Sequence, residues 1–272
     1  MTANPTTLVQ AFLSTGKLPL SRSISQMQTM LSRADYNALD LAEYLRKDPT
    51  LAAGVMAVAN SAFFSRSPSG TIDEAVNRLG TVQLTRIFSQ VLSSAALAHP
   101  LRAYGLPADA IWRRSVLAAV GAEMAAMRQG EDRSAAYMVD LLHLMGLLVL
   151  NRLGLQQPMP PKLQYVDFNR EWTGDEIKLC GLNQAALGAE LLRQLNFPEA
   201  MVTVVSRQYH APVEGLECSL YLGRLVRSTL CDPVPPVADP EVLQRLNFTS
   251  DRQLEDFIAD VREETQRLIN PG

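Results

Sequence analysis

The side chains of this chain that are best suited to chemistry are its three histidines and the acidic residues near them. His143 lies three residues after Asp140, so the two share one face of a predicted helix. With His210 they could supply three ligands to a divalent metal. Three is the largest number of ligands that such a site could have in this chain. An aspartate this close to a helical histidine more often forms a hydrogen bond or ion pair. We therefore expect His143 to be a buried, hydrogen-bonded core residue.

The other residues and motifs that could support catalysis are few. Cys180, Cys218 and Cys231 are odd in number, lack CxxC spacing and have no histidine beside them in the sequence. GxSxG, HExxH and glycine-rich phosphate-binding motifs are missing. We expect the thiols to be small core residues in a reducing cytoplasm, and we predict no catalytic residue and no cofactor.

Two adjacent arginines form a candidate anion site. Arg113 and Arg114 follow Trp112, and a guanidinium presents a planar fork that matches a phosphate or a carboxylate. This pair is the basis for one alternative function, the binding of a cyclic dinucleotide. In the simpler interpretation, one arginine is exposed to solvent and the other forms an internal ion pair.

Composition predicts a packed protein without a strong electrostatic field. Hydrophobic residues make up 47% of the 272 residues, charged residues make up 19%, and the formal net charge is -3. A chain of this length can bury a sizeable core, whereas nucleic acid binding usually needs a positive surface. The longest apolar stretch, residues 138–150, is shorter than the roughly 18 residues that span a bilayer, and no signal peptide is evident. We therefore expect a cytoplasmic protein that binds neither nucleic acid nor membrane.

Helical spacing of apolar residues predominates along the chain, so the predicted fold class is all-α. Helix starts are predicted from an Asp-Pro pair and from two capping boxes, and helix ends from glycines that follow periodic segments. The starts are Asp48–Pro49, Thr71 with Glu74, and Ser250 with Gln253; the ends are Gly80, Gly130 and Gly154. The predicted helices cover residues 4–14, 22–32, 38–47, 49–61, 72–79, 82–98, 108–128, 133–153, 183–195, 198–209, 216–230, 239–246 and 251–268.

Two proline-rich segments interrupt this helical pattern. Residues 156–173 show no period and are predicted to be an irregular connection, which could also act as a recognition loop. A second proline cluster, residues 233–240, separates the last two helices from the rest. Those helices could form either a cap on the bundle or a mobile tail.

Several blocks of the sequence together resemble one family. The segment LAEYLRKDPTLAAGVMAVANSAFFSRSPSGTIDEAVNRLG contains an acidic-proline helix start, the motif ANSAF and a helix that ends in glycine. Later blocks are IWRRS (111–115), LLHLMGLLVL (141–150) and the segment 181–210. Over about residues 15–230 the chain is similar to the HDOD family of bacterial signalling proteins, a degenerate branch of the HD superfamily. The aromatic pair Phe63 and Phe64 beside ANSAF could belong to the core or to an interface.

The resemblance implies a degenerate metal site. Catalytic relatives with the HD fold hold one or two divalent metals through an early histidine, a His-Asp pair and further histidine or aspartate residues. In this chain most of those positions carry side chains that are poor metal ligands. The corresponding residues are Arg114, then His143 followed by Leu144, then Asn183 with Gln184, and finally Tyr209 with His210.

These observations predict an N-terminal helical half, residues 1–105, packed on a degenerate HD-like helical bundle, residues 106–230, followed by a helical tail, residues 231–272. The expected function is a non-catalytic regulatory module in signal transduction that binds a protein partner. One alternative is a residual metal-dependent nucleotide phosphohydrolase that uses Asp140, His143 and His210. The other is the cyclic-dinucleotide-binding module with Arg113 or Arg114.

Overall fold

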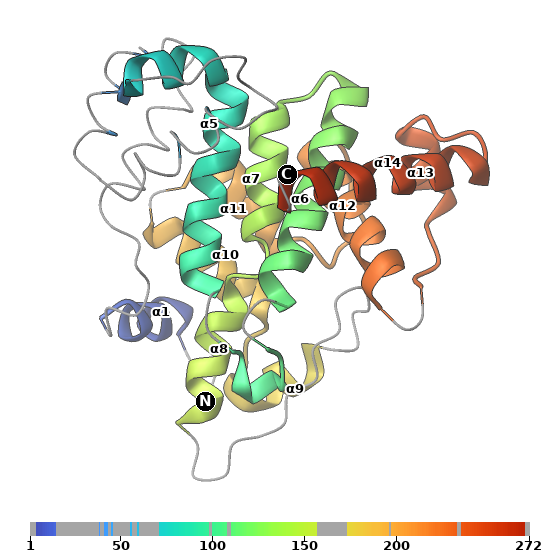
Figure 1. Ribbon diagram of the computed structural model, residues 1–272. Helices are drawn as coiled ribbons and strands as arrows, with labels where there is room; N and C mark the ends of the chain where they lie inside the picture. Colours follow the sequence, from blue (N-terminus) through green and yellow to red (C-terminus); the bar gives the residue numbers. More distant parts are fainter. Residues whose placement is uncertain are drawn as a thin grey trace.

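The protein is a bundle of helices (Figure 1). The computed structural model describes residues 4–14, 38, 41, 42, 45, 55, 59, 71–97, 100–107, 110–156, 173–195, 197–232 and 235–269. Among these residues the regular elements are all helical, and the one β pairing is an isolated bridge between Leu101 and Leu106. The all-α fold predicted from the sequence is confirmed.

The helices are labelled as in Figure 1. In chain order they are α1 (Pro5–Leu13), α5 (Ile72–Leu97), the 3-10 helix η1 (Arg102–Tyr104), α6 (Ala110–Gln129), α7 (Arg133–Leu142), α8 (Gly146–Leu155), α9 (Thr173–Cys180), α10 (Gln184–Gln194), α11 (Glu199–Ser206), α12 (Leu216–Cys231), α13 (Pro240–Arg245) and α14 (Asp251–Ile269). Most bounds lie within a few residues of those predicted. The helices predicted over residues 22–61 lie outside the described residues except at six single positions. These positions, 38, 41, 42, 45, 55 and 59, are helical.

The predicted helix starts have a clear local cause. The Thr71 hydroxyl accepts a hydrogen bond from the Glu74 backbone N–H at 3.2 Å, and the Ser250 hydroxyl accepts one from Gln253 N–H at 3.4 Å. Each bond satisfies one of the amides that a helix leaves unpaired in its first turn. Both predicted helix starts are therefore confirmed, with the hydroxyl bond of each capping box in place.

Two of the three predicted glycine stops are also confirmed. Gly80 and Gly130 have φ values of 68° and 72°, which glycine adopts without the steric cost that a side chain imposes. Gly130 ends α6, whereas the chain resumes a helix directly after Gly80, so α5 is kinked there. Gly154 is wrong as a stop, since α8 continues to Leu155 and Gly154 is buried within it.

The predicted single helix over 133–153 is two helices. α7 ends at Leu142, and α8 begins at Gly146 after a tight turn in which Met145 N–H donates to the Leu142 carbonyl at 3.0 Å. The Nδ1 atom of His143 hydrogen-bonds to the Asp140 carbonyl, which in a continuous helix would accept the amide four residues later. The Asp140 carbonyl thus accepts a side-chain hydrogen bond at the point where the helix breaks. The stretch Ala135–Leu155 is long and apolar enough to cross a membrane, but 78% of its apolar 18-residue window is buried in the bundle, as expected of core helices.

Two large hydrophobic clusters and a small one of three alanines fill the bundle within the described residues. The first includes buried residues of α1, α5, α7, α8, α10 and α11, and the second includes residues of α6, α12, α13 and α14. Phe257 and Val261 of α14 are buried in the second cluster beside Val116 and Val120 of α6, and Figure 1 shows α14 lying across α6. Of the two options for the last helices, the cap on the bundle is the one the structure shows.

The first cluster crosses the predicted boundary near residue 105. Val9 of α1 and Leu84 of α5 belong to the same cluster as Leu187 of α10 and Val202 of α11. Helices α1 and α10 also pack directly on each other. The proposed division into two helical halves and a tail therefore rests on the sequence pattern, and within the described residues one core serves both halves.

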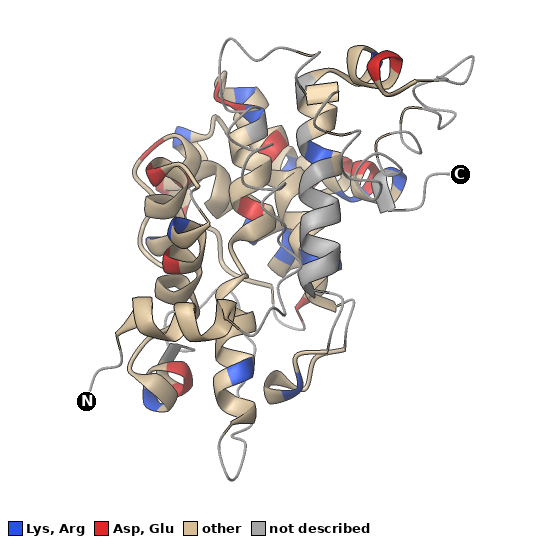
Figure 2. Cartoon of the chain, turned by 90° about the vertical axis from the view of Figure 1, so that its left-hand side faces the viewer, with Lys and Arg blue, Asp and Glu red and all other residues tan. Residues whose placement is uncertain are grey.

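A buried ion network joins four helices. Glu123 of α6 accepts hydrogen bonds from Arg86 Nε of α5 at 2.6 Å and from an Arg133 Nη atom of α7 at 2.9 Å. Arg86 also pairs with Glu264 of α14 at 3.3 Å and lies over the Tyr137 ring. Elsewhere the two signs of charge are interspersed along the helices (Figure 2), as a net charge of -3 suggests. This network ties the N-terminal half to the C-terminal helices.

Candidate functional site

A group of buried polar side chains lies where the end of α7, the start of α10, the end of α11 and the middle of α12 meet. We call it the polar cluster. Charged and amide groups are rarely buried unless they have specific partners, so such a group marks a site that the fold maintains for a reason. Its members are Asp140, His143, Gln184, Gln208, Tyr209, Arg224 and Arg227; all are buried except Tyr209, which is partly exposed.

His143 is fully buried at the C-terminal end of α7. A carbonyl can only accept a hydrogen bond, so the contact with the Asp140 carbonyl places the imidazole proton on Nδ1. Burial lowers the pKa of His143 well below its usual value, and the positive charges of Arg227 and Arg224 lower it further. The imidazole is therefore neutral, as expected of a core histidine.

The Asp140 carboxylate is fully buried and faces α12. A Cβ atom built on Gly223 would lie 3.1 Å from Asp140 Cγ, so the carboxylate lies directly against the backbone of α12 at this glycine. Burial raises the pKa of Asp140 well above its usual value, while Arg224 and Arg227 act in the opposite direction. Burial is the larger of these effects, and neither Asp140 carboxylate oxygen has a hydrogen-bond partner among the described residues.

Amide side chains connect the cluster across α7, α10 and α11. Gln184 Nε2 donates to Gln208 Oε1 at 3.1 Å and to the Tyr209 hydroxyl at 2.7 Å. Gln208 Nε2 in turn donates to the His143 carbonyl at 3.1 Å. Arg224 donates to the Gln208 carbonyl and lies 4.9 Å from the centre of the Tyr209 ring. The cluster is therefore held by hydrogen bonds and by a cation–π contact.

A second buried carboxylate adjoins the cluster at the start of α10. Glu176 of α9 accepts the Tyr104 hydroxyl at 3.0 Å and the Gln184 backbone N–H at 2.7 Å. Burial raises the pKa of Glu176 to about 7, although both hydrogen bonds favour the ionised form. Burial and the nearby Glu176 likewise raise the pKa of Tyr104. Glu176 is thus the group in this region that titrates near neutral pH.

The raised pKa of Glu176 predicts a pH-dependent stability. The folded protein holds the Glu176 proton up to about pH 7 and the unfolded chain releases it near 4.5, so this contribution to stability is lost as the pH rises between those values. The variant Glu176→Gln cannot ionise. The wild type loses this stability as the pH rises, whereas the variant does not. We therefore expect the difference in free energy of unfolding, variant minus wild type, to grow by about 2 to 3 kcal/mol from about pH 5 to about pH 8. Urea unfolding at both pH values measures this difference.

Tyr104→Phe is the matched comparison for that experiment. It removes a hydrogen-bond donor that stabilises the ionised carboxylate, so it should steepen the loss of stability with pH. Parallel pH curves for the wild type and Glu176→Gln would show that Glu176 does not titrate in this range.

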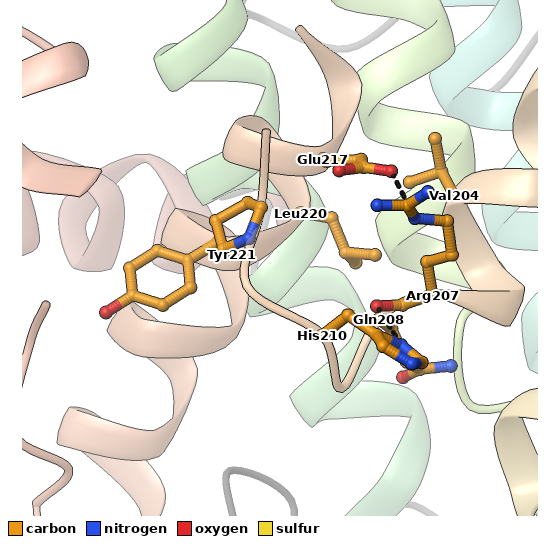
Figure 3. A pocket seen from close by; sticks show the side chains of 8 residues that line it. Val204, Arg207, Gln208, His210, Glu217, Leu220 and Tyr221 are labelled. Carbon is orange, nitrogen blue, oxygen red and sulfur yellow. Dashed lines mark hydrogen bonds and ion pairs between the residues drawn. The ribbon is translucent and has the colours of Figure 1, made fainter. Parts of the chain in front are cut away.

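A shallow pocket opens beside the polar cluster (Figure 3). It encloses about 210 Å³ of empty space, open solvent included. Arg207 Nε pairs with Glu217 at 2.9 Å on one side, and the exposed His210 donates to the Arg207 carbonyl at 3.3 Å. Gln208 reaches both the pocket and the cluster, whereas the Tyr221 hydroxyl points away from the other labelled side chains. The other lining residues are Val204, Pro212 and Leu220.

The residues at the predicted ligand positions have internal roles. Arg114 pairs with Asp232 at 2.7 Å and donates to the Cys231 carbonyl at 3.2 Å, while Arg113 is exposed. This matches the simpler interpretation of the arginine pair and engages Arg114 within the protein. Leu144 is fully buried in the first hydrophobic cluster. The Asn183 side chain caps α10 by accepting Ala186 N–H at 2.9 Å.

These residues do not fit a divalent metal. Asp140 and His143 are close, but His210 lies on the surface, and no three histidine, cysteine or acidic side chains among the described residues come together as ligands. The three-ligand site predicted as an alternative from Asp140, His143 and His210 is therefore wrong. The Asp140 carboxylate oxygens lack hydrogen-bond partners among the described residues, but Asp140 and His143 alone give a metal fewer ligands than the three or four that such sites use.

Five residues in or beside the polar cluster were not identified from the sequence: Arg224, Arg227, Gln208, Glu176 and Tyr104. Both arginines occur in LGRLVRSTL, where the apolar residues have helical spacing. The available signal was two arginines three residues apart in an otherwise apolar segment. Such a pattern also describes a helix with one charged face in solvent, so the sequence did not single it out.

The fold and the polar cluster define an all-helical protein of the HD-like class. The model of the HDOD domain family matches residues 18–211, which is most of the chain. The chain therefore belongs to the HDOD family, as its motifs indicated.

Solved structures agree with this fold. A proposed signal transduction protein from Marinobacter aquaeolei VT8 superimposes with a TM-score of 0.70 at 20% identity, over 92% of this chain and 58% of that protein. A proposed phosphohydrolase from Shewanella amazonensis SB2B gives 0.63 at 22% identity over 90% of each chain. An HDOD domain protein of unknown function from Geobacter sulfurreducens gives 0.64 at 20% identity over 97% of each chain. No curated protein matches in sequence.

Proposed function

We propose that this HDOD protein is a non-catalytic regulatory module that acts by binding a protein partner in signal transduction. The observation that carries the proposal is the donor set of the polar cluster. Asp140 and His143 are the two potential ligands there, and no third histidine, cysteine or acidic side chain among the described residues joins them. Hydrolysis in HD-like proteins needs an activated water on a metal, which this arrangement does not support.

Two further features are consistent with the proposal. The structural neighbours include a proposed signal transduction protein as well as a proposed phosphohydrolase, so the fold accommodates both roles. All three cysteines are free thiols, in line with the proposed cytoplasmic location. Cyclic-dinucleotide binding through Arg113 or Arg114 stays a separate prediction. Calorimetric heat with cyclic di-GMP only at millimolar concentration would count against it.

A hydrolysis assay tests the non-catalytic part of the proposal. The purified chain is incubated with nucleotides, cyclic dinucleotides and nitrophenyl phosphate esters in the presence of Mn²⁺, Ni²⁺ or Mg²⁺. We expect no turnover above the buffer blank, and the same result for Asp140→Asn and His143→Gln. Turnover by the wild type that both substitutions abolish would contradict the proposal, because activity that depends on these two side chains requires a working centre.

Partner binding is tested by affinity capture from native lysate followed by reconstitution. A captured protein is purified separately, and its complex with this chain is measured by calorimetry and sedimentation. We expect a defined stoichiometry and a dissociation constant in the micromolar range or tighter. Failure of every captured protein to bind the purified chain would argue against the proposal.

A further inference from the structure

We propose that α9 is a pH-sensitive latch: the buried side chain of Glu176 holds this helix against η1 and α10 while it carries a proton, and the helix opens when that proton leaves. The opening is local, so the rest of the bundle stays folded. This device goes beyond the proposed regulatory function and does not depend on it.

Helix α9 is anchored to the protein by one buried side chain. It lies at one end of the bundle beside α8 (Figure 1). Among residues 174–180 Glu176 alone is buried, at 5% exposure, and the other side chains are exposed or half-buried. Leu179 and Cys180 are the half-buried ones that pack against the first hydrophobic cluster. A helix of eight residues is not stable by itself in water, so its position depends on these few contacts.

The Glu176 carboxyl joins three elements. Its Oε1 atom accepts the Tyr104 hydroxyl of η1 at 3.0 Å, and its Oε2 atom accepts the Gln184 backbone N–H in the first turn of α10 at 2.7 Å. The Gln184 side chain in turn donates to Gln208 and Tyr209 of the polar cluster. Movement of Glu176 therefore acts on α9 and on the start of α10 together.

The surroundings of Glu176 favour its protonated form. Burial is the largest cause, and it raises the pKa of Glu176 to about 7 although both hydrogen bonds favour the ionised form. Among the described residues, the charged group that acts on this carboxyl is Asp175, whose negative charge also favours the proton. Tyr104 and Cys180 are the other ionisable neighbours. Burial raises the pKa of each, so both are neutral near pH 7.

The cations of the neighbouring elements do not neutralise this carboxyl. In the part of the chain that the structure describes, they are Lys178 of α9 itself, Arg102 of η1, Arg152 of α8 and Arg193 of α10. None of the four forms an ion pair with Glu176; Lys178 pairs with Asp175, and Arg193 pairs with two other glutamates. An ionised Glu176 is therefore a buried charge without a counter-ion, which is strongly unfavourable.

This arrangement couples the opening of α9 to pH. While α9 is docked, Glu176 keeps its proton up to about pH 7, whereas in an open helix exposed to water the proton leaves near 4.5. Protonation therefore favours the docked helix, and this contribution is lost as the pH rises between those values. From about pH 6 to about pH 8 the equilibrium constant for opening should rise about tenfold.

Amide hydrogen exchange of the full chain measures this opening. Protection factors are compared at about pH 6 and about pH 8, after correction for the intrinsic effect of pH on exchange. We expect the α9 amides to be less protected than those of α6 at both pH values, as local opening requires, and to lose about tenfold in protection over this range. Protection in α9 equal to that in α6 would overturn the proposal, because α9 would then open only with the whole fold.

Glu176→Gln has the shape of the protonated acid and cannot ionise. Its α9 protection factors at the two pH values should agree to within about twofold. Asp175→Asn is the matched control, since it makes the same kind of change at a neighbouring side chain of α9 that is 48% exposed, and it should keep most of the tenfold change. The same pH dependence in Glu176→Gln as in the wild type would overturn the proposal.

A pH series of the wild type decides the matter even if Glu176→Gln does not fold. We expect the protection of α9 to fall with rising pH and to level off above about pH 7, where Glu176 is already ionised in the docked helix. Protection that does not change with pH, or that continues to fall by the same factor up to about pH 9, would show that another group or none controls α9.

Discussion

Replacing Gly146 with alanine is expected to lower the free energy of unfolding by at least about 4 kcal/mol, or to prevent folding altogether. Gly146 is the first residue of α8, and its backbone touches the first turn of α10. A Cβ atom at this position would lie 2.7 Å from the Gly188 nitrogen and 2.8 Å from the Gln184 carbonyl carbon, and it would overlap the Gln184 carbonyl oxygen. These are backbone atoms of a helix, so α10 as a whole must move to make room.

That movement would also disturb the polar cluster. Gln184 donates from its side chain to Gln208 and Tyr209, and its backbone N–H donates to Glu176. The close approach of α8 and α10 at Gly146 therefore sets the position of Gln184. Structural damage and loss of the cluster are expected to occur together.

Gly174→Ala is the control for the Gly146 prediction. A Cβ atom on Gly174 in α9 would meet no atom within 4 Å, and Gly174 has an ordinary helical backbone. This substitution should be neutral or stabilise the protein by up to about 1 kcal/mol. Soluble yield, thermal melting and urea unfolding of both variants provide the measurement. Equal stability of Gly146→Ala and the wild type would show that the two helices are further apart than described.

Local signals in the sequence predicted most of the described helices. Capping boxes at Thr71 and Ser250 and the glycines at 80 and 130 act through contacts between residues close in the chain, so the sequence is sufficient to find them. The break between α7 and α8 was missed because the apolar pattern continues through it. At the break Met145 N–H bonds to the Leu142 carbonyl and His143 bonds to the Asp140 carbonyl, contacts that periodicity does not reveal.

The site was predictable only in part, because most of its contacts join residues far apart in the chain. The resemblance to the HDOD family located His143, Gln184 and Tyr209, which the structure brings into one cluster. It did not locate the arginines of α12. The spacing of apolar residues in α12 suggests one buried face, but α12 packs against α6, α7 and α11, so that Arg224 and Arg227 are buried as well. The helices packed around a helix determine how many of its faces are buried.

The pair Arg113 and Arg114 illustrates the same limit. Residue type alone indicated that one arginine would be exposed and the other paired. The partner, Asp232, lies 118 residues further along the chain, after α12. Only the packing of α12 on α6 brings the two together.

Replacing Glu123 with glutamine is expected to cost about 3 to 5 kcal/mol of stability, the usual effect of removing one partner from a buried ion pair. The Glu123 side chain is 1% exposed and pairs with Arg86, whose side chain is 8% exposed, and with the more exposed Arg133. Glutamine preserves the shape but removes the negative charge. Among the described residues, Arg86 then keeps one acidic partner, Glu264, at 3.3 Å and at the rim of the network.

An exposed ion pair in α14 provides the control variant, and amide hydrogen exchange provides a second measurement. Asp256→Asn makes the same kind of change in α14, in a pair with Arg252 whose side chains are 74% and 88% exposed, and it should cost no more than about 0.5 kcal/mol. Because Arg86 links α5 to α6 and α14, Glu123→Gln should also speed amide hydrogen exchange in α14 before global unfolding. A stability loss as small as that of Asp256→Asn would mean that hydrophobic packing alone holds α14 on the bundle.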